Sequence, residues 1–133
     1  MWINNETGVI QNVKELSEKA HEKNIPFLCD GTQAIGKVPV NMQENKIGVL
    51  PISAHKFYGP KGVGALYIRR KKPRITIAPL ITGGGQENKL RAGTLNTPGI
   101  VGLGEAIELA IDELEKNTKR LKIIKEEFKK FFL

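Results

Sequence analysis

The chain has 133 residues, 40% of them hydrophobic, and a formal net charge of +7 at neutral pH. That length and apolar content match one globular domain with a real core, and the apolar runs fall far short of the roughly 20 residues that cross a bilayer. The single cysteine excludes an internal disulfide framework, the two histidines leave no plausible zinc cluster, and lysines spread over Glu-containing helices argue against nucleic acid. We therefore expect a cytoplasmic protein with no metal and with neither nucleic acid nor a membrane as partner.

The first residues predict a partial strand followed by a helix. Trp2-Ile3 is too short for a complete strand, so we expect the chain to begin in the middle of a sheet, as a truncated piece would. Asn12, with Glu15 three positions later, forms a capping box. The apolar spacing that follows predicts a helix as far as Lys23, and His21 lies in its last turn, where a solvated side chain is expected.

Asp30 lies where chemistry is expected in a doubly wound sheet. The apolar run 25–29 predicts a buried strand that leads into Asp30, and such sheets bind ligands outside the carboxyl ends of their strands. Asp30 can hold a pyridine nitrogen protonated, or it can cap the turn that follows. Gln33 can donate to a ring oxygen or cap the next short helix. Cys29, inside the apolar run, is most simply an inert core residue.

The middle of the chain predicts further strands and loops. Residues 36–48 indicate a short strand and a connecting loop without identifiable chemistry, whereas 49–52 and 65–68 each predict a strand. The basic run 69–74 predicts a solvated hairpin tip. Residues 75–81 predict one more strand, at a sheet edge because it contains Pro79.

Ser53, His55 and Lys56 bring a hydroxyl, an imidazole and an amine to the end of the predicted strand 49–52. Pyridoxal phosphate suits this combination, because its aldehyde condenses with a lysine amine while hydroxyl and imidazole donors hold its phosphate. A solvated strand end accounts for the same residues equally well. Both interpretations stay open on these residues alone.

Two glycine-rich segments resemble nucleotide loops only superficially. Residues 59–64 lack the P-loop spacing and lead into a strand rather than a helix, which argues against an ATP site. Residues 83–87 are followed by Arg91-Ala92-Gly93-Thr94, a cation and a hydroxyl that can bind a phosphate or simply belong to a connector.

Residues 98–133 predict one long amphipathic helix, with Thr97 as its N-cap and Pro98 in its first turn. Such a helix usually bridges to another domain. The apolar residues at 131–133 lead us to expect that the chain is truncated here as well.

Five segments taken together resemble the ordered motifs of the cysteine desulfurases, a family in the class V aminotransferase group of pyridoxal-phosphate enzymes. They are Asn5-Glu6-Thr7-Gly8, Asp30-Gly31-Thr32-Gln33, the run 53–62 around Lys56, Gly83-Gly84-Gly85-Gln86-Glu87 and Arg91-Ala92-Gly93-Thr94. The resemblance covers essentially the whole chain. It implies an α/β fold, part of an aspartate aminotransferase-like large domain with a mostly parallel sheet, flanking helices and a long C-terminal helix. Residues 1–97 would be a partial cofactor-binding large domain, and 98–133 would lead towards a small domain.

The resemblance also implies roles in cofactor chemistry. Lys56 would hold pyridoxal 5'-phosphate covalently and then move the Cα proton of the substrate. Asp30 would pair with the pyridinium nitrogen and Gln33 with the phenolic oxygen of the ring. The implied reaction takes sulfur from L-cysteine, leaving alanine and an enzyme persulfide that supplies an acceptor such as an iron-sulfur scaffold protein.

Four further residues would complete the site. Ser53 and His55 would bind the cofactor phosphate, Thr94 would reach the phosphate of a neighbouring subunit in a homodimer, and Asn5 would lie beside the ring and substrate. A selenocysteine lyase, another enzyme of the same group, and a non-catalytic binding piece remain the alternatives.

The sequence departs from the family pattern in ways that limit the expected activity. The family's catalytic cysteine lies beyond the end of this chain, and Cys29 does not occupy its position. A histidine that stacks on the cofactor ring and part of the phosphate cup precede Met1 in the family. Gly48 and Pro51 stand where the family usually has Asp and a small hydroxyl residue. We therefore expect that this chain alone cannot complete the reaction.

Overall fold

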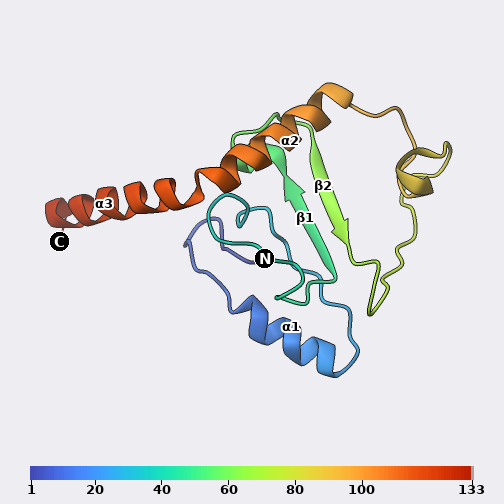
Figure 1. Cartoon of the computed structure of the whole chain (residues 1–133), viewed down its shortest axis with the longest axis horizontal. Coiled ribbons are helices and arrows are strands. Elements are labelled where there is room, and N and C mark those ends of the chain that lie inside the picture. The colour runs from blue at the N-terminus through green and yellow to red at the C-terminus, as the bar shows by residue number, and fades with distance from the viewer. Residues whose placement is uncertain (133) are drawn as a thin grey trace.

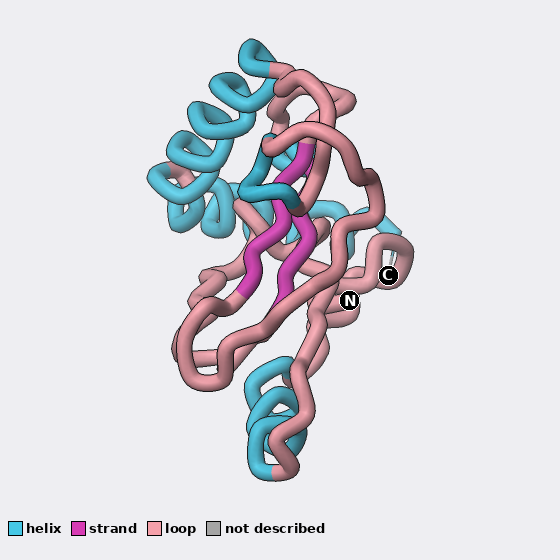
Figure 2. Tube along the Cα trace, turned by 90° about the vertical axis from the view of Figure 1, so that its right-hand side faces the viewer, coloured by secondary structure: helices cyan, strands magenta, loops and turns pink. Residues whose placement is uncertain are grey.

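A computed structural model describes residues 1–132 of the chain, which form a small strand pair with helices at both ends. The elements are α1 (Val13–Glu22), β1 (Val49–Ser53), the single 3₁₀ turn η1 (Ala54–Phe57), β2 (Gly64–Ile68), the short turn η2 (Gln86–Lys89), α2 (Thr97–Asp112) and α3 (Leu114–Phe132). Figures 1 and 2 place α1 and α2 at opposite ends of the strand pair, and Figure 1 shows α3 projecting away from the rest.

The sheet is built around β1. On one side β1 pairs antiparallel with β2, with Val49 opposite Ile68. On its other side the Cys29 N–H donates to the Val49 carbonyl (3.0 Å) and the Gly31 N–H to the Pro51 carbonyl (3.1 Å), in parallel orientation. The α/β class is thus confirmed, but the pairing of the two extended strands is antiparallel rather than parallel. A short connection over 54–63 joins them, whereas a parallel crossover needs about a dozen residues or more.

The segment 25–29 contributes one parallel bridge, Leu28 with Val49, rather than the buried strand that its apolar run predicts. Ile25 and Leu28 are both more than half exposed. Pro26 has no N–H to donate, so pairing begins only at the Phe27 carbonyl, which accepts from the N–H groups of Gly48 (2.9 Å) and Val49 (3.2 Å).

Helix α1 begins at the predicted cap. The Asn12 Oδ1 accepts from the Glu15 N–H (3.4 Å), and the Asn12 Nδ2 donates to the Glu15 carboxylate (2.8 Å). Val13 and Ser17 are the buried residues of this helix, and His21 is exposed, as expected. Val13 joins a core cluster whose other buried members are Trp2, Ile3, Cys29, Ala34, Ile47 and Leu50.

The expected single helix over 98–133 is wrong in two respects. The N-cap is Asn96, whose Oδ1 accepts from the Gly99 N–H (3.2 Å), so Thr97 is already helical. The helix is also interrupted at Glu113, where ψ of −2° opens the turn between α2 and α3. Leu133, the last residue of the predicted helix, lies outside the described residues.

Helix α2 packs on the turn η1 rather than on a broad sheet face. Ala54 and Phe57 from the turn and Leu103 and Ala106 from the helix form a second buried cluster. Ile52 packs against both core clusters, so β1 connects them. By contrast, α3 has no buried residue.

Arg69 is a structural residue, not part of a solvated tip. Its Nε donates to the Ile47 carbonyl (2.9 Å), its Nη2 to the Met42 carbonyl (2.7 Å) and its Nη1 to the Gln43 Oε1 (3.3 Å). The guanidinium therefore fastens the loop before β1 to the end of β2. Arg70, its neighbour, is exposed as expected.

Two other predicted strands do not form. Residues 36–48 are turns, in which the Asn41 side chain accepts from the N–H groups of Gln43 (2.9 Å) and Glu44 (3.1 Å). Residues 75–81 form one isolated bridge, between Ile81 and Arg91, and the Ile75 N–H donates to the Arg69 carbonyl (2.9 Å), but within residues 1–132 they join no strand ladder. None of the helices over this described part of the chain is both long and apolar enough to span a membrane.

Candidate functional site

Lys56 lies on the turn η1, directly after the carboxyl end of β1. Ala54 and Phe57 are buried beneath the turn, so His55 and Lys56 between them face outwards. Tyr58, with a left-handed φ of 68°, ends the turn, and the Gly59 N–H donates back to the Ala54 carbonyl (2.9 Å). The fold thus presents the Lys56 amine on a short segment whose backbone is fixed at both ends.

Ser53 and His55 form a polar pair beside Lys56. The Ser53 Oγ lies 3.0 Å from the His55 Nδ1, within hydrogen-bonding distance. The bond orients the imidazole, while the other ring nitrogen, Nε2, has no protein partner in residues 1–132. The pair can therefore offer donors to an anion at the strand end.

Asp30 lies at the end of the segment that pairs with β1, and it is held as a carboxylate. Its Oδ1 accepts from the Thr32 N–H (2.9 Å) and from the Thr32 hydroxyl. Burial acts to raise the pKa of Asp30, but these hydrogen bonds and the N-terminal ammonium outweigh it, so the pKa is lowered. Asp30 is therefore ionised at neutral pH and turned partly towards its own turn, as a capping residue would be.

Lys37 lies beside the predicted site residue Gln33, although the sequence pattern did not single it out. Its Nζ donates to the Gln33 Oε1 (2.7 Å), which leaves the Gln33 amide group free to donate elsewhere. Burial and the neighbouring Lys56 ammonium lower the pKa of Lys37. Lys37 lies four residues after Gln33, and in a helix or a helical turn this spacing predicts contact between the two side chains. The sequence alone does not show that residues 33–37 form such a turn.

Parallel pairing brings the Asp30 and Lys56 segments to one edge of the sheet. Because the Gly31 N–H donates to the Pro51 carbonyl, the carboxyl end of the 27–31 segment lies beside the carboxyl end of β1. The Lys37 Nζ donates to Gln33 in the turn after Asp30, and the Lys56 ammonium contributes, after burial, to the lowered pKa of Lys37. The strand ends thus gather an amine, a hydroxyl–imidazole pair and a carboxylate.

Asn5 and Thr94 are not joined to this group. Both are exposed, and no side-chain hydrogen bond links either of them to another predicted site residue within 1–132. Asn5 lies in a turn that the Asn4 Oδ1 holds by accepting from the Thr7 N–H (2.8 Å). Arg91 holds the Thr94 loop by donating to the carbonyls of Gly93 (3.2 Å) and Thr94 (3.4 Å).

Cys29 has the environment of a core residue, as its place in the apolar run predicts. Its side chain is 3% exposed, and burial together with the adjacent Asp30 carboxylate raises the pKa of its thiol. A buried thiol with a raised pKa is a poor nucleophile. Over the described residues 1–132, no group of three or more His, Cys, Asp or Glu side chains is placed to hold a metal ion.

Helices at both ends of a strand pair, with polar side chains at the carboxyl ends of parallel-paired segments, are typical of an α/β domain that binds its ligand at the strand ends. The chain belongs to the aminotransferase class-V family, whose model matches residues 1–130. It is 52% identical over 128 residues to a cysteine desulfurase, IscS, of Rickettsia prowazekii, a match that covers 96% of this chain and 31% of the relative. The chain thus spans about a third of the length of the curated relatives it matches.

Solved structures share the fold. A NifS-like protein, 43% identical, superposes with a TM-score of 0.89 over 96% of this chain and 34% of its own. A protein described as SspA in complex with cysteine, 46% identical, superposes with a TM-score of 0.75 over 80% of this chain and 30% of its own. These likenesses confirm the resemblance to the cysteine desulfurases and the α/β fold class.

Proposed function

We propose that this chain is the lysine-bearing part of a pyridoxal-phosphate-dependent cysteine desulfurase. The observation that carries the proposal is the exposed Lys56 amine at the sheet edge, beside the Ser53–His55 pair and next to the segment that ends in the Asp30 carboxylate. An anionic aromatic aldehyde needs a covalent amine, donors for its phosphate and an acid for its ring nitrogen. This donor set fits all three needs.

Each residue has a defined task in this proposal. Lys56 holds the cofactor through its amine and, once released, moves a proton at the substrate Cα. Asp30, ionised because its pKa is lowered, keeps the ring nitrogen protonated. Ser53 and His55 bind the phosphate, and Gln33, its carbonyl oxygen held by Lys37, turns its amide donor to the ring oxygen. Bound there, the cofactor supplies an electron sink for the bond changes at the substrate.

The proposed substrate is L-cysteine, and the reaction balances with one additional thiol. The C–S bond of cysteine breaks, a protein thiolate accepts the sulfur to form an S–S bond, and the carbon skeleton leaves as alanine. Cys29 is unsuited to that role because it is buried and its thiol pKa is raised. We therefore propose that the 133-residue chain does not release alanine from cysteine by itself.

Partners and organisation follow from the same proposal. A sulfur-acceptor protein such as an iron-sulfur scaffold would take the persulfide, and Asn5 and Thr94 would reach the cofactor only in a completed site, with Thr94 serving a neighbouring subunit of a homodimer. Residues 1–97 would belong to the cofactor-binding domain and 98–133 would lead towards a second one. The proposed location is the cytoplasm.

The test is to add pyridoxal phosphate to the purified chain, reduce with borohydride and map the labelled peptide. We expect the pyridoxyl label on Lys56 and its loss in Lys56→Ala. The matched control is Lys61→Ala, which removes another exposed lysine from the same loop and should leave the label in place. Label spread equally over Lys56, Lys61 and Lys37 would contradict a specific cofactor site, because only Lys56 has the phosphate donors beside it.

A further inference from the structure

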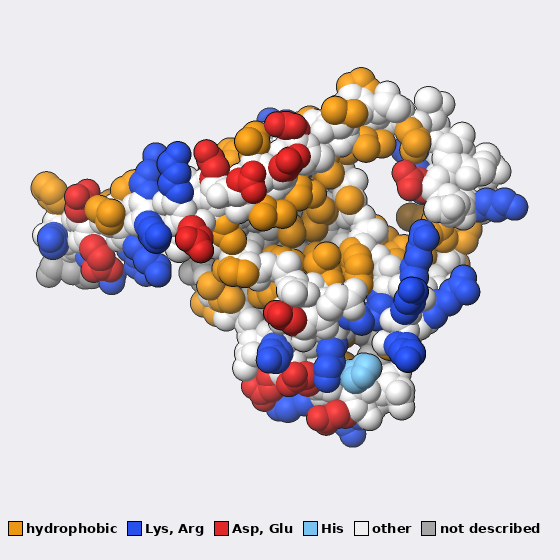
Figure 3. Space-filling view, viewed as in Figure 1, with side chains coloured by type: hydrophobic (Ala, Val, Ile, Leu, Met, Phe, Trp, Pro, Cys, Tyr) orange, Lys and Arg blue, Asp and Glu red, His pale blue; other side chains and the backbone are white. Residues whose placement is uncertain are grey.

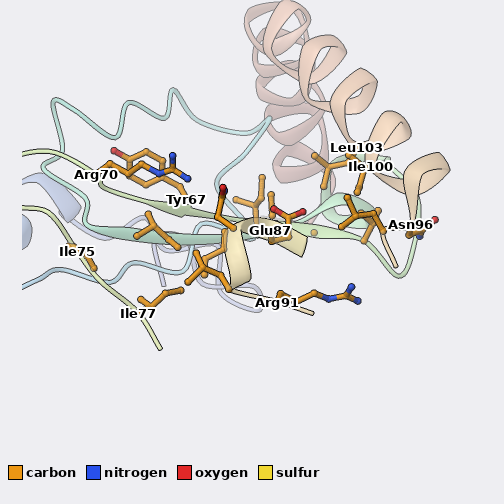
Figure 4. A pocket seen from close by; sticks show the side chains of 18 of the residues that line it. Tyr67, Arg70, Ile75, Ile77, Glu87, Arg91, Asn96, Ile100 and Leu103 are labelled. Atoms are coloured by element: carbon orange, nitrogen blue, oxygen red, sulfur yellow. The ribbon is translucent and has the colours of Figure 1, made fainter. Parts of the chain in front are cut away.

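The polar groups at the strand ends lie outside the large cavity of the molecule. That cavity, of about 1280 Å³, runs along β2 and has Tyr67, Arg91 and Ile100 among its walls (Figure 4). Figure 3 shows the molecule hollowed there, between the strand pair and the 82–96 loop. Neither Asp30 nor Lys56 lines this space. The orientation of the Asp30 carboxylate therefore depends on hydrogen bonds close to it rather than on the walls of this cavity.

The backbone on both sides of the Asp30 side chain is fixed. The Asp30 carbonyl accepts from the Trp2 N–H (2.8 Å), and the next residue, Gly31, donates its N–H to the Pro51 carbonyl of β1 (3.1 Å). A Cβ on Gly31 would lie 2.7 Å from the Leu50 side chain, so the chain passes β1 closely at this point. The Cα of Asp30 thus has a set place at the strand ends, and only the side-chain torsions of Asp30 stay to be decided.

Thr32 holds one oxygen of the Asp30 carboxylate with two donors. The Thr32 N–H (2.9 Å) and the Thr32 hydroxyl both donate to the Asp30 Oδ1. Within residues 1–132 the Asp30 Oδ2 makes no hydrogen bond, and no buried side-chain oxygen in that part of the chain lacks a partner, so Oδ2 is open to solvent. One carboxylate oxygen is therefore occupied by the turn, and the other is available to a ligand.

The hydroxyl is the part of this arrangement that depends on the side chain of Thr32. Any residue except proline would supply the N–H at this position, whereas the second donor needs a short hydroxyl side chain. Burial acts to raise the pKa of Asp30, but the two bonds from Thr32 and the N-terminal ammonium outweigh it and lower the pKa. A carboxylate that stays ionised and keeps one rotamer suits a protonated pyridine nitrogen, because a charge-assisted hydrogen bond needs a defined direction.

We infer that Thr32 is a positioning residue for the cofactor chemistry: its hydroxyl fixes the Asp30 Oδ1 so that Oδ2 pairs with the ring nitrogen of pyridoxal phosphate. The inference rests on the proposed function, in which Asp30 meets that nitrogen. Thr32 itself contacts neither the ring nor the substrate. It preorganises the carboxylate, and a preorganised group binds its partner more tightly because less rotamer freedom is lost on binding.

The first test needs no cofactor. The Asp30 carboxyl is titrated by NMR in the purified chain, and Asp30→Asn assigns its signal. Thr32→Val keeps the shape of the side chain but removes the hydroxyl, so we expect it to raise the pKa of Asp30, whereas Thr32→Ser should keep the wild-type pKa. Thr118→Val is the matched control, because it makes the same change on α3, which has no buried residue, and it should leave the pKa of Asp30 unchanged.

The second test compares two ligands. The variants are titrated with pyridoxal phosphate and with an analogue in which C–H replaces the ring nitrogen, and the label that borohydride traps at Lys56 is measured. We expect Thr32→Val to weaken the capture of pyridoxal phosphate about threefold to tenfold and to leave capture of the analogue unchanged, since the analogue cannot pair with Asp30. Thr32→Ser should behave like the wild type with both ligands. Adding Thr32→Val to Asp30→Asn should weaken capture no further.

The results that overturn the inference differ from the one that overturns the proposed function. No label at Lys56 in the wild-type chain would remove the proposed cofactor site and the inference with it. Specific label at Lys56, together with an unchanged pKa of Asp30 in Thr32→Val or with equal losses for the two ligands, would overturn the inference alone. A further loss on adding Thr32→Val to Asp30→Asn would do the same, because the hydroxyl would then act on another group.

Discussion

The hydrogen bonds of Arg69 predict how much unfolding free energy the protein loses when its guanidinium is removed. Arg69→Met keeps the aliphatic stem but removes the bonds to the Ile47 carbonyl (2.9 Å) and the Met42 carbonyl (2.7 Å), both partly buried. A hydrogen bond from a charged donor contributes about 1.5–3 kcal/mol, so two such bonds give about 3–6 kcal/mol, and the low end applies because both are only partly buried. Solvent reaches the third bond, to Gln43, so we assign it nothing and expect a total loss of about 3 kcal/mol.

The assay is urea denaturation followed by circular dichroism. With a slope of roughly 1–3 kcal/mol per M for a small protein, the loss should lower the midpoint by about 1 M or more at unchanged slope. Arg70→Met is the control, because Arg70 is exposed and donates no side-chain hydrogen bond in the described chain. A loss below about 0.5 kcal/mol for Arg69→Met, or an equal loss for Arg70→Met, would refute the role assigned to this guanidinium.

Three further predictions concern local structure and pH. Asn96→Ala should cost about 1 kcal/mol in urea denaturation because it removes the N-cap of α2, while Thr97→Ala should cost much less. Gly64→Ala should destabilise the protein by about 1–3 kcal/mol, since the new Cβ would lie 2.5 Å from the Ile52 carbonyl oxygen. In the same assay Gly104→Ala should stabilise it by up to about 1 kcal/mol, because a Cβ on Gly104 in α2 meets no atom within 4 Å and alanine favours the helix. Because the pKa of Asp30 is lowered in the folded state, its carboxylate stabilises the fold above the ordinary pKa of 3.8, and this stabilisation is lost as the pH falls through the folded-state pKa. The Asp30→Asn variant should therefore lose less stability than the wild type when the free energy of unfolding is measured from about pH 5 down to about pH 2.

Local sequence signals predicted the features that depend on neighbours along the chain. The Asn12–Glu15 cap, the strand at 65–68 and the outward-facing Lys56 at a strand end all rest on residues within a few positions of one another. The same logic failed at Asn96 and Thr97, because two adjacent residues can both cap a helix and only the backbone geometry decides between them.

Features that depend on contacts between residues far apart in the sequence could not be predicted from local patterns. Residues 25–29 and 75–81 have strand composition, but each makes only a single bridge here, since pairing needs a neighbouring strand that composition cannot supply. Arg69 looked like one basic residue in a solvated run, and its partners at 42–47 are more than 20 positions away. The predicted roles of the site residues stay predictions, whereas the contact of Lys37 with Gln33 and the lack of a side-chain hydrogen bond from Thr94 to another predicted site residue within 1–132 could be seen only in the structure.

The spacing between α2 and the lysine-bearing turn depends on very small side chains. A Cβ on Gly59 would lie 3.1 Å from the Cβ of Ala106, and a Cβ on Gly36 would lie 3.0 Å from that of Ala110. A methyl group added at Gly59 or Gly36 would push α2 outwards and shift the turn η1, which carries Lys56. A side chain larger than alanine at position 106 is therefore expected to displace the turn that carries Lys56, because Ala106 packs against Ala54 and Phe57 in that turn.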